Sequence, residues 1–143
     1  MTDVADVRRR VRAAIERAKR EASERRSRAE ADAAVGQQFI RHVATPVAKQ
    51  LSTVLRAEGF FFRLSTPAGA VRLVSESQRE DFIELSVDTT QDPVTILTVV
   101  NHVRGHRVST RERPLRAEVS LESLTEADVL DFLVEALPVF VER

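Results

Sequence analysis

The stretch 93–103 carries apolar residues at odd and even positions alike, among them Ile96, Leu97, Val99 and Val100. Successive side chains of a strand point to opposite faces, so this run predicts a central strand that is covered on both sides. The run is short for an amphipathic helix, and its β-branched residues disfavour one. The rest of the chain is therefore expected to pair with this strand or to cover it.

Four other segments alternate apolar and polar residues with the period of two that is typical of half-buried strands. They lie at 60–64, 71–75, 83–87 and 106–110, and turn residues separate them, including Arg104-Gly105 after the central strand. Short connections favour hairpins, so we expect a mostly antiparallel sheet of about five or six strands. At Pro114 the apolar phase slips by one residue, which predicts a bulge or a fresh edge strand over 115–121.

Helical patterns flank the predicted sheet. Residues 3–34 contain no proline or glycine and are rich in Ala, Arg and Glu, which predicts one long helix. A core-facing stripe then recurs every four residues from Phe39 to Leu55, and at Pro46 we expect either a kink or the start of a second helix. The last helix should begin near Glu126, with Thr125 and Asp128 forming a capping box. The predicted fold class is therefore α+β, with N-terminal helices, the sheet, and a C-terminal helix packed on it.

Gly36 marks the expected boundary between two parts of the chain. Residues 1–35 should form a charged helical arm, coiled-coil-like or partner-binding, and residues 36–143 a compact α+β domain. A helix with so little apolar surface is either frayed in solvent or laid against a partner. We favour the partner, because an apolar line runs along the start of the arm at Val4, Val7, Val11 and Ile15.

Composition excludes several classes of protein. The chain has no cysteine, so neither disulfides nor thiolate chemistry is expected. No apolar run approaches the roughly 18 residues that span a bilayer, and the acidic start lacks an apolar signal segment. A cytoplasmic location without membrane contact is the resulting expectation. The sequence also lacks a phosphate-binding glycine loop, a serine elbow and a dinucleotide fingerprint, so no cofactor is expected.

Histidines and carboxylates offer little catalytic chemistry. A two-residue turn at Arg104-Gly105 would place His102 and His106 on opposite faces of the sheet, although a longer loop would change this. Glu84 and Asp88 share the outer face of one strand, where paired carboxylates perform acid–base chemistry only if one of them is buried. Solvated carboxylates are the simpler interpretation. We expect neither a metal site nor an enzyme, and a polar pocket that joins His102, Glu84 and Asp88 would contradict this.

Charge is balanced overall, with 22 basic and 22 acidic residues, but it is unevenly distributed. Residues 1–34 carry a net +3, residues 101–116 a net +4 and residues 117–143 a net −6. The basic cluster within the second of these segments consists of Arg104, Arg107, Arg111, Arg113 and Arg116. Arginines on a hairpin can contact phosphates, but the cluster contains no aromatic residue on which bases could stack. Pairing with the acidic C-terminal helix, of the same chain or of a partner chain, is the preferred interpretation.

Surplus apolar surface without a reactive group favours a non-enzymatic, cytoplasmic protein-interaction or assembly module. Such a module would form a homodimer or bind a protein partner, as adaptors and chaperones do. The predicted contact residues are Val4, Val7, Val11 and Ile15 of the arm and Phe132, Phe140 and Val141 of the last helix. The alternative is nucleic-acid binding through the arginine-rich hairpin and the arm, with a steep dependence on salt.

Overall fold

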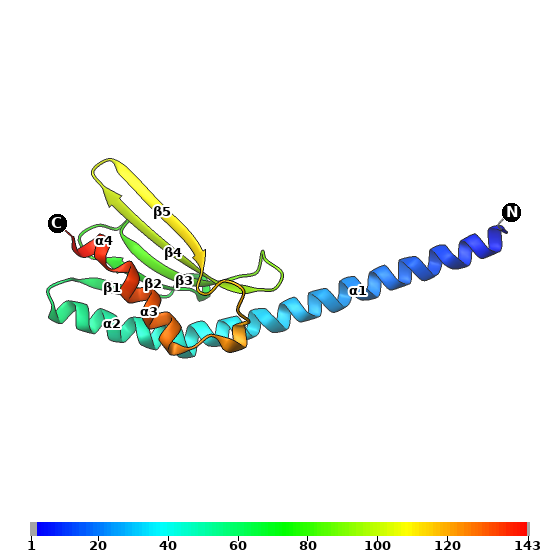
Figure 1. The fold of residues 1–143 in the computed structure, drawn as a ribbon, viewed down its shortest axis with the longest axis horizontal. Helices are drawn as coiled ribbons and strands as arrows, with labels where there is room; N and C mark the ends of the chain where they lie inside the picture. The colour runs from blue at the N-terminus through cyan, green and yellow to red at the C-terminus, as the bar shows by residue number, and fades with distance from the viewer. Residues whose placement is uncertain (1–2, 143) are drawn as a thin grey trace.

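A computed structural model describes residues 3–142 and shows a helical arm attached to a sheet-and-helix domain (Figure 1). The helices are α1 (Val4–Phe39), α2 (Thr45–Ala57), α3 (Glu126–Ala136) and α4 (Pro138–Val141). The strands are β1 (Phe62–Ser65), β2 (Val71–Ser75), β3 (Phe82–Asp88), β4 (Thr95–Arg104) and β5 (Arg107–Pro114). The α+β class and the helix–sheet–helix order predicted from the sequence are confirmed.

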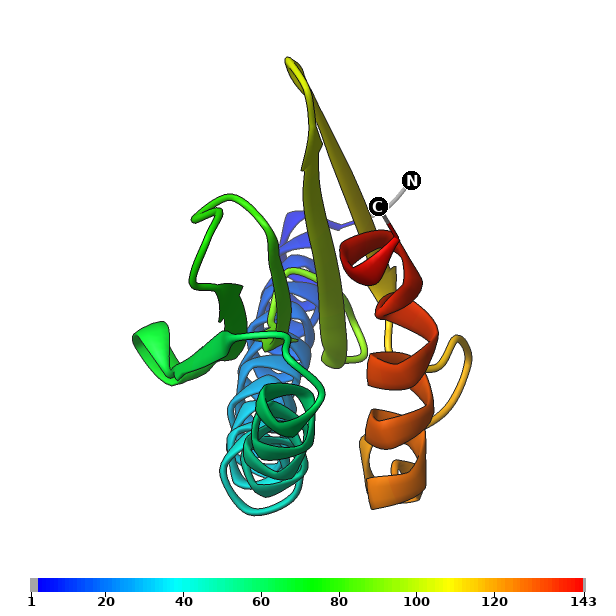
Figure 2. The same cartoon turned by 90° about the vertical axis from the view of Figure 1, so that its left-hand side faces the viewer.

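The five strands form one antiparallel sheet in the order β1-β2-β3-β4-β5, so each strand pairs with its neighbours in the sequence. The apolar run at 93–103 forms β4, which lies second from the edge, while β3 is central. The prediction that this run is covered on both faces is wrong, because α2 and α3 pack on the same face of the sheet (Figure 2). Leu97 and Val99 point to the other face and remain half-buried.

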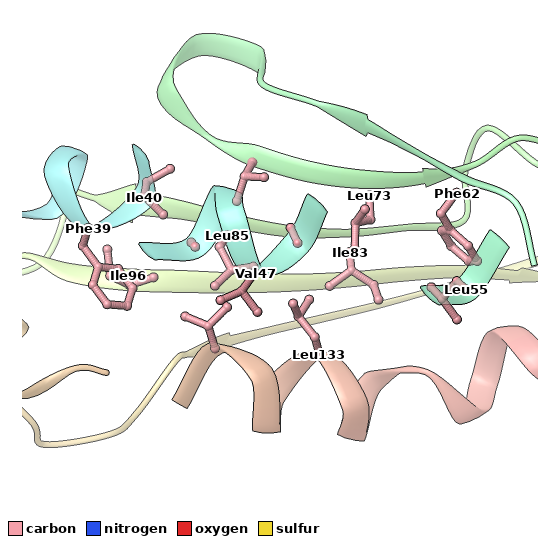
Figure 3. Close-up of a cluster of buried hydrophobic side chains, with 14 of the residues drawn as sticks. Phe39, Ile40, Val47, Leu55, Phe62, Leu73, Ile83, Leu85, Ile96 and Leu133 are labelled. Atoms are coloured by element: carbon pink, nitrogen blue, oxygen red, sulfur yellow. The ribbon is translucent and has the colours of Figure 1, made fainter. Parts of the chain in front are cut away.

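The hydrophobic core fills the space between the sheet and the two helices that cover it (Figure 3). Ile83 and Leu85 of β3 and Ile96 of β4 meet Val47 of α2 and Leu133 of α3 there. Burial of each large aliphatic side chain is worth about 1.5–3 kcal/mol. The apolar residues that alternate along the strands and those that recur every four residues along the helices therefore meet in one core. This agreement is why the sequence predicts the fold class correctly.

Helix α1 continues through Gly36, where the sequence predicts a boundary. A Cβ atom at Gly36 would lie 3.0 Å from both Cγ1 and Cγ2 of Val87 on β3. The glycine therefore lets the helix approach the sheet closely and does not interrupt it. Arm and domain share one helix, and the position of Gly36 shows where the arm meets the sheet.

Between α1 and α2, residues Ile40–Ala44 form a π-helical turn. The carbonyl of Ile40 accepts bonds from the backbone N–H of Thr45 and from its Oγ1, the latter at 2.7 Å. Pro46 has no N–H to donate, and its ring conflicts with a regular preceding turn, so the wider turn accommodates it in the first turn of α2. A second helix, α2, therefore begins here with Pro46 in its first turn, which is one of the two arrangements expected from the sequence, and α1, the π-helical turn and α2 together form one helical rod from Val4 to Ala57 (Figure 1).

The N-terminal part of α1 projects away from the domain (Figure 1). The predicted apolar line at its start is uncovered, because the side chains of Val4, Val7, Val11 and Ile15 are between 46% and 73% exposed. Across residues 3–142, no helix combines the length and apolar character needed to cross a bilayer.

The β4–β5 hairpin turns at Gly105-His106, one residue later than predicted. Arg104 pairs with Arg107, and Gly105 has φ 63°, a left-handed conformation that a tight hairpin turn requires and glycine adopts without strain. Beyond Pro114 the chain leaves the sheet, so the bulge or fresh strand predicted for 115–121 is wrong. Leu121 is buried in a short 3₁₀ helix (Leu121–Ser123) that contacts α1, and Leu115 packs against the same core, so the apolar residues of this segment are covered without a strand ladder.

Replacing Leu133 with Ala should lower the free energy of unfolding by about 2–5 kcal/mol, because the fully buried side chain would leave a cavity under α3. The adjacent Val134 is 52% exposed, and Val134→Ala should cost less than about 0.5 kcal/mol. Urea denaturation followed by circular dichroism measures both. Equal losses would contradict this orientation of α3.

Gly36→Leu should destabilise the protein by about 1–3 kcal/mol, because the added side chain would overlap Val87. Adding Val87→Ala should recover part of that loss in the same denaturation assay. Ala29→Leu, on the exposed arm of the same helix, is the control and should be close to neutral. A Gly36→Leu variant as stable as the parent would show that the arm leaves the domain elsewhere.

Candidate functional site

A groove of 480 Å³ lies between the β4–β5 hairpin and the helices α3 and α4. Figure 2 shows α3 beside the hairpin, whose tip extends beyond the helices. The apolar part of the lining consists of Val100, Leu115, Phe132, Ala136 and Val139. Phe132, predicted as a contact residue, therefore lines a concave surface.

The predicted arginine cluster forms one wall of this groove. Arg104 and the other even-numbered residues of β4 share a face of the sheet, and their partners on β5 include Arg107, Arg111 and Arg113. This is the face on which α2 and α3 pack. Arg111 and Arg113 line the groove together with Arg116, which follows the strand, while Arg104 and Arg107 lie nearer the hairpin tip.

The opposite wall is acidic. Asp128, Asp131 and Glu135 of α3 line the groove, and their spacing of three and four residues places them on one side of the helix. The predicted capping box holds the first of these carboxylates: Asp128 Oδ2 accepts from the N–H of Thr125 at 2.9 Å, and Thr125 Oγ1 accepts from the N–H of Asp128 at 3.3 Å. Two walls of opposite charge thus face each other across an apolar floor.

One ion pair bridges the two walls. Arg116 Nη1 lies 3.5 Å from Asp128 Oδ1. Within residues 3–142, neither Arg111 nor Arg113 forms an ion pair shorter than 4.0 Å with the carboxylates of α3. The predicted pairing of the arginine cluster with the acidic helix is therefore present at Arg116. Arg111 and Arg113 line the groove without such a partner on α3.

His102 lies at the far end of the groove and belongs partly to the core. Its ring packs edge-on against Phe140, with centroids 5.4 Å apart. Its Nδ1 is buried 3.5 Å from Asp81 Oδ1, without the geometry of a hydrogen bond. His106 occupies the exposed hairpin turn, so the two imidazoles do not meet.

Glu84 and Asp88 point to the opposite face of the sheet from His102. Arg72 holds Glu84 Oε1 through Nε at 2.9 Å and Nη2 at 2.8 Å, and its guanidinium also lies 4.1 Å above the ring centroid of Phe82. The polar pocket that would have contradicted an interaction module does not form from His102, Glu84 and Asp88. Within the described part of the chain, no group of three metal-ligating side chains gathers either.

The last helices place their predicted contact residues differently from the expectation. Phe140 packs against Phe62 with ring centroids 5.7 Å apart and is 8% exposed, so it belongs to the core and offers no surface to a partner. Val141 is half-buried. The exposed aliphatic side chains of α3 and α4 are Leu130, Val134 and Val139. A helix that is apolar on several sides does not reveal by periodicity which side faces the core.

No sequence pattern pointed to the polar bonds at the base of the hairpin. Asn101 is 8% exposed; its Nδ2 donates to the carbonyl of Glu80 at 2.6 Å, and its Oδ1 accepts from Thr110 Oγ1. Asp81 Oδ1 accepts from the N–H of Val103 at 2.8 Å. These bonds join the loop before β3 and strand β5 to β4. An asparagine within an apolar run was the available signal.

Comparisons of the chain with protein-family models, with curated proteins and with solved structures find no match. The candidate site therefore rests on the geometry of the groove and on the exposed surfaces of the arm and α3.

Asn101→Ala should lower the free energy of unfolding by about 1–3 kcal/mol, because it leaves the partners of a nearly buried amide unsatisfied. Hydrogen exchange should show faster exchange at the base of the β4–β5 hairpin. Ser109→Ala, on the exposed neighbouring strand, is the control. Unchanged exchange in the Asn101 variant would mean that these bonds do not support the hairpin.

Proposed function

We propose that this protein is a non-enzymatic protein-interaction module, which binds an extended segment of a partner protein in the groove between β5 and α3. The observation that carries the proposal is the groove, whose apolar floor lies between walls of opposite charge that are joined by one ion pair. Concave apolar surfaces with a few convergent polar groups are the usual form of ligand sites in proteins.

An extended segment suits this site because β5 is an edge strand. All eight of its residues are exposed, and within the five-stranded sheet its outer side has no partner strand. A peptide can add to such an edge through backbone hydrogen bonds, with alternate side chains entering neighbouring pockets. The groove follows α3 and α4 from Asp128 to Val139, about 16 Å of helix. That length corresponds to about five residues of extended chain.

The charges of the walls define the chemistry of the segment. Carboxylates of the ligand would lie beside Arg111 and Arg113, and its basic side chains beside Asp131 and Glu135. Aliphatic side chains would cover the floor around Phe132. Arginines and proline on an edge strand also discourage indiscriminate strand pairing, so a segment without acidic residues should bind poorly.

Nucleic-acid binding is a second candidate, which the shared face of Arg104, Arg107, Arg111 and Arg113 favours. It ranks lower because the carboxylates of α3 lie opposite two of these arginines and would repel phosphates. The two arginines nearest the tip offer the clearest test. If this candidate is right, the full chain should be retained on heparin at low salt, and Arg104→Ala with Arg107→Ala should reduce that retention.

To test the proposed function, peptides that bind the full chain are selected from a random library. The selected peptides are then synthesised, and their affinity for the protein is measured by fluorescence anisotropy. Selected peptides should combine acidic and aliphatic residues at alternate positions. Ser109→Trp should weaken their binding by at least about tenfold, because the indole would fill the groove from β5.

Val108→Trp is the matched control, since Val108 is the adjacent, exposed residue on the other face of β5. It should leave the peptide affinity unchanged. A selection that yields no peptide, or peptides that both tryptophan variants bind equally, would overturn the proposed function.

A further inference from the structure

The apolar line of the arm lies too far from its own domain to be covered by it. Ile15 precedes Gly36 by 21 residues, which is about 32 Å of helix. The helix is continuous between these two residues and points away from the sheet (Figure 1). Within residues 3–142, no other part of the chain covers Val4, Val7, Val11 and Ile15, so a second molecule is the candidate to do so.

Arginines flank this apolar line on both sides. With 3.6 residues per turn, Arg8 and Arg12 lie along one flank of Val11, and Arg10 and Arg17 lie along the other. Of the acidic residues in this part of the arm, Asp6 and Glu16 lie towards the back of the helix, and Asp3 caps its N-terminus. The surface that covers the line should therefore be apolar with acidic margins.

A second arm in parallel is a poor candidate for that surface. In a parallel coiled coil, each flank of the seam faces the opposite flank of the partner helix, about five residues further along the chain. With Val4, Val7 and Val11 in the seam, Arg10 would face Ile15 of the partner arm and Arg17 would face Ala22, so a parallel pair would give these arginines no carboxylate partner. The sequence-based expectation of a coiled coil is therefore not the arrangement that the charges favour.

The outer side of α3 has the required chemistry. Leu130 and Val134 lie four residues apart, and their side chains are 45% and 52% exposed. Glu126, Asp131 and Glu135 on the same helix are exposed, and residues 117–143 carry a net −6. The lengths also agree, since α3 extends for about 16 Å and the arm from Val4 to Ile15 for about 17 Å.

We propose that the N-terminal arm of one chain docks on the outer side of α3 of a second copy of this chain. The line from Val4 to Ile15 would cover Leu130 and Val134 by ordinary helix-on-helix packing, and the flanking arginines would lie beside the acidic residues of α3. No arm residue lines the groove, but Asp131 and Glu135 lie where the groove meets the outer side of α3, so self-association and the proposed peptide binding share these two carboxylates.

Sedimentation velocity on the full chain at concentrations up to about 100 µM tests the proposal. The parent protein should self-associate, and Arg8→Glu with Arg12→Glu should weaken association by at least about tenfold. Asp131→Arg with Glu135→Arg should do the same. Combining the four substitutions should restore association, because each charge then meets its opposite again.

Arg9→Glu with Arg20→Glu is the matched control. It changes the charge of the arm by the same amount but on the side opposite Val11, and it should leave association intact. A monomeric parent protein would overturn the proposal. Unchanged association in the variant that carries Arg8→Glu and Arg12→Glu would also overturn it. The same holds if both double variants lose association and the protein with all four substitutions does not regain it.

Two further readouts separate this proposal from the others. The Arg8 and Arg12 variant should still bind the selected peptides, so a failure of self-association and a failure of the proposed function are distinguishable. Binding of the parent arm to anionic phospholipid vesicles, without any self-association, would identify a membrane surface as the occupant and would also overturn the proposal.

Discussion

Helices α2 and α3 bury one face of the five-stranded sheet, and this packing fixes the positions of both the groove and the arm. Ile83, Leu85 and Ile96 provide the sheet side of that layer, and Val47 and Leu133 provide the helix side. Because both helices pack on this face, the β4–β5 hairpin extends past their edge. The groove between β5 and α3 is a direct consequence, since the helix layer ends before the sheet does (Figure 2).

A second consequence concerns the arm. The rod from Val4 to Ala57 is anchored in the core by the part that follows Gly36, where Phe39, Val47 and Leu55 are buried. Gly36 permits the close approach to β3, and the π-helical turn accommodates Pro46 without ending the rod. The direction of the exposed arm is therefore set by packing more than twenty residues further along the chain, in the domain itself.

The fold brings the basic and the acidic segments of the chain side by side. The basic hairpin and the acidic C-terminal helix are neighbours in the sequence and also in space. Within residues 3–142, the ion pair that links the arginine cluster to α3 is Arg116–Asp128. The remaining charges face a groove on one side of α3 and solvent on the other. A chain with zero net charge can thus present strongly charged local surfaces, which give specificity and steer association more than they add to affinity.

Local patterns of residues were sufficient to predict the helices and strands of this protein and its fold class. Alternation in 83–87, the stripe from Phe39 to Leu55 and the Thr125–Asp128 cap are local signals, and each depends only on neighbouring residues, so they predicted strands, helices and a helix start correctly. Which apolar faces are covered depended instead on how the helices and strands pack together. Both faces of β4 and several sides of α3 are apolar, so the hydrophobic pattern does not distinguish the side that faces the core from the others. The packing of α3 beside α2 buried Phe140, left Leu130 and Val134 exposed and left the second face of β4 half-buried, because burial depends on contacts between residues that are distant in the sequence.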